Sequence, residues 1–390
     1  MDLQLVGRGR PVLVALAAAS AIAVIALIIS MMGVRTAQAE AARTTTTTLA
    51  PVAAEPEVFV GPAAGLALVP DGGVQLWGGR DRDPQLVLHE GVILPFLHRS
   101  GEWLLVTTMC NESAWVHAKD VEIVAQAEAG IGGPGFDLSK ATIVLDPGHG
   151  DRDWGGVGPS GLSEKEVNLD IANRVRLLME SGNDIDWATG AITPGAGAPA
   201  LGNIFLTRDL DGPNSGDYEL GLRYRMSVGT AAGADAFVSI HNNTVPRIDT
   251  DIPGTEVYYS TGVDGSDRLA GIIYEEMLRS FSEFAADWSG GELQGARARI
   301  DPETGDDYYG LLRRATMPAV IVEGVYISEP EEEALLATPE FRQAYAEAVY
   351  RGVVRFLTTD DSGSGINRPE IFPDDAGTVS GNGCTLPEQP

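Results

Sequence analysis

The sequence predicts a covered α/β domain in its second half, a small β-rich unit before that domain and a membrane-spanning helix near the N-terminus. Three observations lead to this prediction. Strand-like apolar runs alternate with helical patterns over residues 138–358, short β-branched and aromatic runs fill residues 57–125, and residues 12–34 are apolar and uncharged. A chain of 390 residues is long enough for two folded units with linkers.

The alternation in the second half predicts a sheet covered on both faces, because strands separated by helices pack in that way. The predicted strands are residues 141–146, 204–207, 236–240, 255–260 and 319–323. The predicted helices lie around residues 165–180, 217–232, 266–284, 331–336 and 339–357.

The apolar run at residues 12–34 is long enough, as a helix, to cross a hydrocarbon core about 30 Å thick. Basic residues flank it on both sides, so their positions do not fix its orientation. Residues 37–39, Ala-Gln-Ala, resemble a signal-peptidase site, yet the run is longer than a typical cleavable segment. We expect a single-pass cell-membrane anchor with residues 1–11 in the cytoplasm and the rest of the chain outside. A secreted protein cleaved near Ala39 is the alternative.

Three segments have compositions that predict no packed structure. Residues 35–56 are rich in Ala, Thr, Glu and Pro and are expected to be a disordered spacer. Residues 126–137 are Gly-rich and are expected to be a linker. Residues 359–390 lack periodicity and are expected to be a disordered tail.

Charge and cysteine content exclude some functions. Acidic residues outnumber basic ones 55 to 27, and no basic block occurs, so a nucleic-acid partner is not expected. Cys110 and Cys384 are the two cysteines, and their spacing matches no thiolate metal site. A disulfide between them stays open for an exported chain.

The histidines of the α/β region indicate a candidate metal site. Of five histidines in the chain, His89, His98 and His117 fall in the β-rich unit, which leaves His149 and His241. Both follow strand-like runs at their carboxyl ends, where open α/β sheets bind ligands. Either histidine alone could be a structural hydrogen-bonding residue, but two in equivalent positions strengthen the hypothesis of a shared ligand site.

Glu164 has two interpretations. It stands at the start of a predicted helix after a Gly-rich loop, so it could be a first-turn carboxylate favoured by the helix dipole. It could also be a metal ligand that the loop brings beside His149. Spacing alone favours the first interpretation.

Five motifs in order carry a family resemblance. They are "IVLDPGHG" at residues 143–150, "SEKEVNLDIA" at 163–172, "FLTRD" at 205–209, "GADAFVSIHNN" at 233–243 and "MPAVIVEGVYISEPEEEALL" at 317–336. Together they resemble the zinc-dependent N-acetylmuramoyl-L-alanine amidase family. The resemblance implies a three-layer α/β domain with a mostly parallel six-stranded sheet flanked by helices.

The resemblance also implies roles for individual residues. The family's zinc ligands fall on His149, Glu164 and His241, and its catalytic glutamate falls on Glu323. Two imidazoles and one carboxylate leave a fourth zinc position open to water, and Glu323 can take a proton from that water and deliver it to the leaving amine. The implied reaction cleaves the amide between N-acetylmuramic acid and L-alanine in peptidoglycan, during wall remodelling or daughter-cell separation. Asn242 is expected to bind substrate or to orient the groups behind the ligands.

Other residues and segments keep more than one interpretation. Glu323 could instead close a strand and face solvent, and Arg208 and Arg225 match recurrent family arginines but could equally form surface ion pairs. Residues 184–201 and 284–308 depart from the family pattern and could shape the groove, cover it or bind a partner such as an activator protein. Residues 284–308 are our candidate for an occluding segment.

The β-rich unit is predicted to be a small antiparallel barrel or sandwich. Its motifs "GEWLLV", "SAWV" and "AKDV" resemble a bacterial Src-homology-3-like domain, a module often attached to wall-lytic enzymes. The alternative is that Trp103 and Trp115 are core aromatics of another small β unit.

Two further functions compete with the amidase hypothesis. A non-catalytic wall anchor would bind peptidoglycan without cutting it, and it predicts the loss of a ligand or of Glu323, none of which is missing. Another zinc amidohydrolase or peptidase would act on soluble muropeptides.

Overall fold

The computed structural model describes residues 64–78, 84–88, 92–108, 113–127, 130, 132–150, 153–195, 199–208, 221–244, 248–290 and 294–371. The predicted anchor, the spacer, both cysteines and His89 lie outside these residues. Within the described part of the chain, no helix has both the length and the apolar character needed to cross a membrane.

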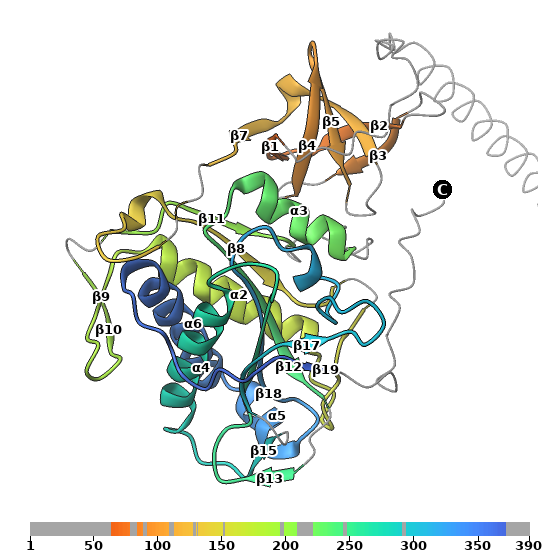
Figure 1. Cartoon of the computed structure of the whole chain (residues 1–390). Coiled ribbons are helices and arrows are strands. Elements are labelled where there is room, and N and C mark those ends of the chain that lie inside the picture. The colour runs from red at the N-terminus through yellow and green to blue at the C-terminus, as the bar shows by residue number, and fades with distance from the viewer. Residues whose placement is uncertain are drawn as a thin grey trace, which may run out of the picture. The chain divides into compact units, whose positions relative to one another are not determined.

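The β-rich unit is a seven-stranded sheet in which all neighbouring strands run antiparallel (Figure 1). Its order is β3-β2-β6-β5-β4-β1-β7. The strands are β1 Gly65–Leu68, β2 Val74–Gly78, β3 Pro84–Leu88, β4 Ile93–Ser100, β5 Trp103–Thr107, β6 Ser113–His117 and β7 Glu122–Ala125. Trp103 is buried and meets Trp77 edge to face, with 6.1 Å between ring centroids. The predicted antiparallel strands are present, and the likeness to a Src-homology-3-like domain stays a prediction.

The second half contains a six-stranded mixed sheet of order β11-β8-β12-β18-β14-β16. Four of its pairings are parallel, and only β14 with β18 is antiparallel. The strands are β8 Thr142–Pro147, β11 Asn203–Leu206, β12 Ala236–Asn243, β14 Glu256–Tyr259, β16 Gly295–Arg297 and β18 Ala319–Tyr326. The predicted α/β class with a mostly parallel sheet is confirmed.

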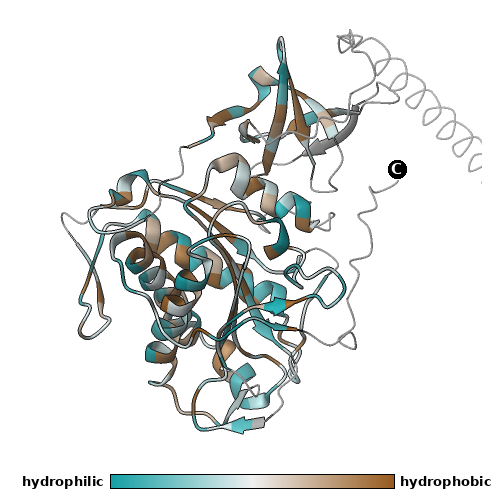
Figure 2. Cartoon of the chain, in the orientation of Figure 1, coloured by the Kyte–Doolittle hydropathy of each residue, from teal (hydrophilic) through white to brown (hydrophobic). Residues whose placement is uncertain are grey.

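Helices cover both faces of this sheet (Figure 1). They are α2 Glu164–Glu180, α3 Leu222–Ala232, α4 Ser266–Phe281, α5 Pro330–Leu336 and α6 Pro339–Thr358. Side chains alternate along β8: Ile143 and Leu145 pack with the core that α2, α4 and α6 share, and Val144 packs with the core of α3. The strands are therefore hydrophobic on both faces. Figure 2 shows the brown of hydrophobic residues along the strands of this sheet.

Residues 284–308, one of the two segments that depart from the family pattern in the sequence, contain strands. β15 Trp288–Gly290 pairs with β13 Ile248–Thr250, and β16 is the sixth strand of the main sheet. The segment has no apolar run long enough to predict a strand, because β15 and β16 are only three residues each, although all of these residues are buried. Part of this segment therefore belongs to the main sheet.

Residues 184–201 contain a hairpin, with β9 Asn183–Ile185 antiparallel to β10 Ile192–Pro194. The hairpin follows the carboxyl end of α2, a helix about 25 Å long at 1.5 Å per residue. It therefore lies at the opposite end of α2 from Glu164.

The linker and the start of the tail are packed, contrary to prediction. Gly133 N donates to Leu357 O at 2.8 Å, and Gly130 N donates to Asp235 Oδ1 at 2.7 Å. After α6 the chain runs beside β16, where Ala296 N donates to Gly365 O, and β19 Glu370–Ile371 pairs with β17 Arg299–Ile300. Backbone groups make most of these hydrogen bonds, and ion pairs such as Arg297–Glu370 add to them; such contacts leave no periodic side-chain signal.

Candidate metal centre

His149 lies in the loop after β8, and its backbone has φ 62°, a left-handed conformation that non-glycine residues rarely adopt. Its Nδ1 is 2.9 Å from Asp153 Oδ2, and its Nε2 is 3.1 Å from Glu164 Oε2. Asp153 therefore orients the ring so that Nε2 faces the centre of the site.

Two glycines allow the chain to come this close to the ligands. A Cβ on Gly148 would lie 2.2 Å from the His241 ring. Gly155 has φ 66°, and a Cβ there would lie 2.5 Å from both Glu164 Oε2 and His149 Cδ2. Glycine is therefore needed in this loop for two reasons: a side chain would collide with the ligands, and the backbone of Gly155 is left-handed.

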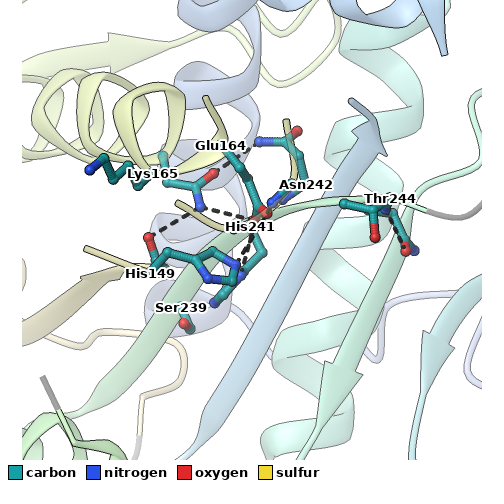
Figure 3. A network of polar contacts seen from close by, with 12 residues as sticks. His149, Glu164, Lys165, Ser239, His241, Asn242 and Thr244 are labelled. Atoms are coloured by element: carbon teal, nitrogen blue, oxygen red, sulfur yellow. Dashed lines mark hydrogen bonds and ion pairs between the residues drawn. The ribbon is translucent and has the colours of Figure 1, made fainter. Parts of the chain in front are cut away.

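Glu164 is the first residue of α2, and its carboxylate is buried at the centre of the cluster (Figure 3). It accepts hydrogen bonds from Gly156 N at 2.7 Å, Asn242 N at 3.0 Å and Asn168 Nδ2 at 3.2 Å. These contacts differ from those of the helix-capping residue that spacing favoured. The loop path, which spacing cannot reveal, turns Glu164 toward His149 and His241.

His241 follows the fully buried run 236–240 of β12. Its Nδ1 is 3.2 Å from Glu164 Oε1, and its carbonyl accepts a hydrogen bond from Tyr345 Oη at 2.9 Å. The two imidazole rings meet edge to face with centroids 4.8 Å apart. Figure 3 shows His149, Glu164 and His241 converging from the loop, the helix and the strand.

The donor set fits a zinc ion. One ligand atom from each of His149, Glu164 and His241 lies within 4.8 Å of the other two. Imidazole nitrogens with one carboxylate are a donor set that zinc prefers, and three protein ligands are typical of sites that keep one position open. The sequence-predicted ligands are brought together.

The charges of the cluster are strongly coupled. Burial alone would raise the pKa of Glu164, but hydrogen bonds and charge from the two histidines hold it well below its usual range. Burial would lower the pKa of His149, yet Asp153 and Glu164 raise it to about 10. Burial lowers the pKa of His241. One imidazole is therefore poised to be charged and the other neutral beside a single buried carboxylate.

Glu323 lies beside the cluster on β18. Its Cα pairs with that of His241 on one side and with that of Glu256 on the other. Its Oε2 is shielded from solvent and has no hydrogen-bond partner among the described residues. Burial, followed by the charges of Glu164 and Glu256, raises the pKa of Glu323 well above its usual range. The interpretation of Glu323 as a solvent-facing strand end does not fit these surroundings.

Asn242 is buried behind the ligands. Its backbone N–H donates to Glu164, and its side-chain Nδ2 donates to Asn168 Oδ1 at 3.0 Å. This position fits the expected role of orienting groups behind the ligands. Contact with substrate, the other expected role, would require the side chain to be reached from solvent, and it is almost wholly covered.

Arg208 and Arg225 are buried and hold the backbone that carries His149. Arg208 donates to the carbonyls of Pro147, Gly148 and Lys165 at 2.8–2.9 Å. Arg225 donates to Asp146 Oδ1 at 2.6 Å and to the carbonyls of Pro147 and His149. The surface ion-pair interpretation of both arginines is therefore wrong.

Three supporting residues escaped the sequence prediction. Asp146 accepts from Arg225, Thr207 and Ser239, and these bonds hold its pKa low despite burial. Asn168 stands one helical turn after Glu164, and that spacing is the signal that could have identified it. Glu333 accepts from Ser160 N and Leu162 N, which fixes the loop before α2.

The fold and the site define a class: α/β domains that gather a His-Glu-His metal centre at the carboxyl ends of their strands, with a buried glutamate beside it. The sequence pattern of one family, described as N-acetylmuramoyl-L-alanine amidase, matches residues 143–188 and 201–355. The chain belongs to this family. The match is interrupted within the predicted departure at 184–201, whereas it runs through 284–308, so that second segment is part of the family domain.

Several known proteins are similar to this chain. It is 27% identical over 256 residues to N-acetylmuramoyl-L-alanine amidase AmiC of Neisseria meningitidis, covering 58% of this chain and 55% of that protein. It is 32% identical over 218 residues to the amidase LytC of Bacillus subtilis, covering 55% and 35%. The chain thus spans about half and about a third of these relatives. The solved amidase AmiC2 of Nostoc punctiforme is 29% identical, covers 57% of this chain and 99% of its own, and has a TM-score of 0.42.

Proposed function

We propose that this chain is a zinc-dependent N-acetylmuramoyl-L-alanine amidase that hydrolyses the amide between the lactyl group of N-acetylmuramic acid and L-alanine in peptidoglycan. The observation that carries the proposal is the pairing of His241 with Glu323 on adjacent strands, which sets a buried carboxyl beside the His-Glu-His cluster. Family membership supports the same activity.

In this proposal His149, Glu164 and His241 hold the zinc ion. When bound, zinc would polarise the scissile carbonyl and increase the acidity of water. Glu323 takes the proton of the attacking water on its unpartnered Oε2 and delivers it to the nitrogen of the leaving L-alanine. Burial and the neighbouring carboxylates raise the pKa of Glu323, so this carboxyl holds a proton more strongly than an exposed one, as a group that must take up a proton before delivering it requires.

The supporting residues keep the ligands in place during the reaction. Asp153 fixes the ring of His149, and the amides of Gly156 and Asn242 fix the carboxylate of Glu164. Arg208 and Arg225 hold the carbonyls of the loop, so the site is built on a rigid frame.

The test uses the purified full-length chain and intact peptidoglycan sacculi, with release of new L-alanine amino termini as the readout. We expect release with zinc, none after treatment with a chelator, and recovery when zinc is added back. Glu323→Gln should abolish release while zinc still binds with 1:1 stoichiometry. Glu164→Gln should lose both zinc and activity.

Glu166→Gln is the matched control, because Glu166 is an exposed glutamate in the same first turn of α2. It should keep full activity. If Glu323→Gln releases L-alanine termini as fast as the unaltered chain, the proposed mechanism is wrong. If sacculi are bound but never cut, the wall-anchor alternative is correct, and if only soluble muropeptides are cut, the other zinc amidohydrolase alternative is correct.

We also propose that the chain acts outside the cell membrane, held by the apolar run at residues 12–34, in wall remodelling or daughter-cell separation. Peptidoglycan lies on that side of the membrane, which supports the orientation. Protease added to cells without a wall should degrade the C-terminal part of the chain and leave a membrane-bound fragment. Recovery from the culture medium of a chain that begins near Ala39 and is otherwise complete would support secretion instead.

A further inference from the structure

Trp154 is a large apolar side chain left open to solvent beside the metal centre. The side chains of Trp154 and Val157 are 53% and 56% exposed, and both belong to the loop that joins β8 to α2. The next residue, Gly155, is the glycine whose backbone lies against Glu164 and His149. The backbone that carries the indole therefore passes directly beside two candidate metal ligands.

The backbone around Trp154 is held on both sides. Its carbonyl accepts hydrogen bonds from Lys165 N at 3.2 Å and from Ser163 Oγ at 3.4 Å. Gly155 N donates to Asp153 Oδ1 at 3.1 Å, and Gly156 N donates to Glu164 Oε2. These hydrogen bonds hold the backbone of Trp154 in place, so the position of the indole is defined. The exposed side chain of a mobile loop tip would have no such defined position.

One face of the indole already has a partner. Lys165 Nζ lies 3.7 Å from the ring centroid, a cation–π contact that fixes the plane of the ring. About half of Trp154 is still exposed, so part of the indole is open to solvent. A flat apolar surface of this kind binds a partner that is itself flat and has apolar hydrogens, such as a sugar ring.

The shape of the exposed ring distinguishes the two halves of the substrate. A pyranose ring presents a flat face of C–H groups, which can stack on the open part of an indole. A stem peptide next to the scissile amide presents a small methyl side chain and polar backbone groups instead. The exposed indole therefore fits the glycan side of the scissile bond.

We propose that Trp154, together with Val157, forms a platform on which the pyranose ring of N-acetylmuramic acid stacks when its lactyl amide lies at the metal centre. The inference rests on the proposed amidase function and adds a residue that sets specificity for glycan-bearing substrates. Trp154 acts by binding and takes no part in proton transfer, so its loss should change KM more than kcat.

The kinetic experiment compares two substrates with the full-length chain: an N-acetylmuramoyl-peptide, and a D-lactoyl-peptide that lacks the sugar. Trp154→Ala should raise KM for the muramoyl-peptide about tenfold, the effect of uncovering roughly half an indole, and leave kcat within about twofold. KM for the lactoyl-peptide should not change. Trp154→Phe should recover most of the loss, because it retains an aromatic face.

Trp187→Ala is the matched control. Trp187 is 42% exposed on the β9–β10 hairpin, at the far end of α2 from the site. It should leave both substrates unaffected. If Trp154→Ala raises KM equally for both substrates, the ring contacts the peptide or supports the loop, and the platform is refuted. No change in KM for either substrate refutes it as well.

A binding experiment keeps this inference separate from the amidase proposal. N-acetylmuramic acid without peptide is titrated into the full-length chain while the indole N–H signals are followed by NMR. The Trp154 signal, assigned by its absence in Trp154→Phe, should shift and the Trp187 signal should not. A chain that cuts peptidoglycan but shows no such shift overturns the platform alone, whereas a shift in a chain that cuts nothing overturns the amidase function alone.

Discussion

Replacement of Arg225 by methionine tests whether the buried arginine clamp holds the metal centre. Arg225 is 5% exposed and donates to the side chain of Asp146, itself 1% exposed, and to the carbonyls of Pro147 and His149. Methionine fills similar volume and removes all three bonds. It leaves the Asp146 carboxylate buried with only its two hydroxyl partners.

Arg225→Met has two effects, one on the stability of the fold and one on the position of His149. Breaking a buried ion pair by removing one partner typically costs about 3–5 kcal/mol of folding free energy. His149 also loses a bond that supports its left-handed backbone, a conformation that by itself costs about 1–3 kcal/mol. We therefore expect the free energy of unfolding to fall by about 3–5 kcal/mol, and zinc affinity to fall by about 10- to 100-fold as the His149 ring loses its position.

The assay is urea unfolding of the zinc-free chain, followed by competition for zinc with a chromophoric chelator. Arg223→Met is the matched control, an exposed arginine two residues earlier on the same helix, and it should change neither quantity. Arg225→Met combined with Asp146→Asn should recover part of the stability but not the zinc affinity. If Arg225→Met lowers stability by less than about 1 kcal/mol and binds zinc as tightly as Arg223→Met, the clamp argument is refuted.

Three further predictions concern the ligands and the frame. Gly155→Ala should weaken zinc binding at least about tenfold, because the added Cβ meets the carboxylate of Glu164. Gly161→Ala is the control: Gly161 also has a positive φ, but an added Cβ meets no atom, so this variant should lose stability and keep its zinc affinity. Equal zinc affinities of the two variants would contradict this prediction. Asp153 and Glu164 raise the pKa of His149 to about 10, so zinc must displace a proton from this imidazole when it binds. The apparent zinc affinity should therefore rise about tenfold per pH unit between pH 6 and 8. Calorimetry in two buffers with different ionisation enthalpies should detect the released proton. Burial raises the pKa of Glu332 to about 7. The folded state therefore holds this proton more tightly than the unfolded state, so this contribution to stability is complete below about pH 4.5 and is lost, by about 3 kcal/mol in total, as pH rises through 7. Glu332→Gln should flatten the stability curve in that window, and an unchanged slope would show that the carboxylate is satisfied by its two backbone donors.

The sequence predicted the order and type of the main elements because periodicity records burial. The predicted strand at residues 319–323 corresponds to β18, and the predicted helix at 165–180 corresponds to α2, which begins one residue earlier. It also placed His149 and His241 at strand ends, which parallel pairing brings to one edge of a sheet.

Periodicity could not predict segments that are short or irregular. β16 is a three-residue edge strand in an acidic stretch, and all three of its residues are buried, so it shows no alternation between buried and exposed positions. Residues 359–371 pack through backbone hydrogen bonds and scattered ion pairs such as Arg355–Asp361. Neither segment therefore leaves a pattern of period two or 3.6.

The sequence by itself determined the fold class and identified His149 and His241 as candidate ligands. A family resemblance in the sequence added Glu164 as the third. Only the tertiary structure decided what Glu164 contacts, because its direction depends on a loop whose glycines are pressed against the ligands. The same holds for Arg208 and Arg225, whose sequence context left a surface ion pair and a family role equally open. Burial and hydrogen-bond partners belong to the packed chain, and it is these that turn separate residues into one candidate metal centre.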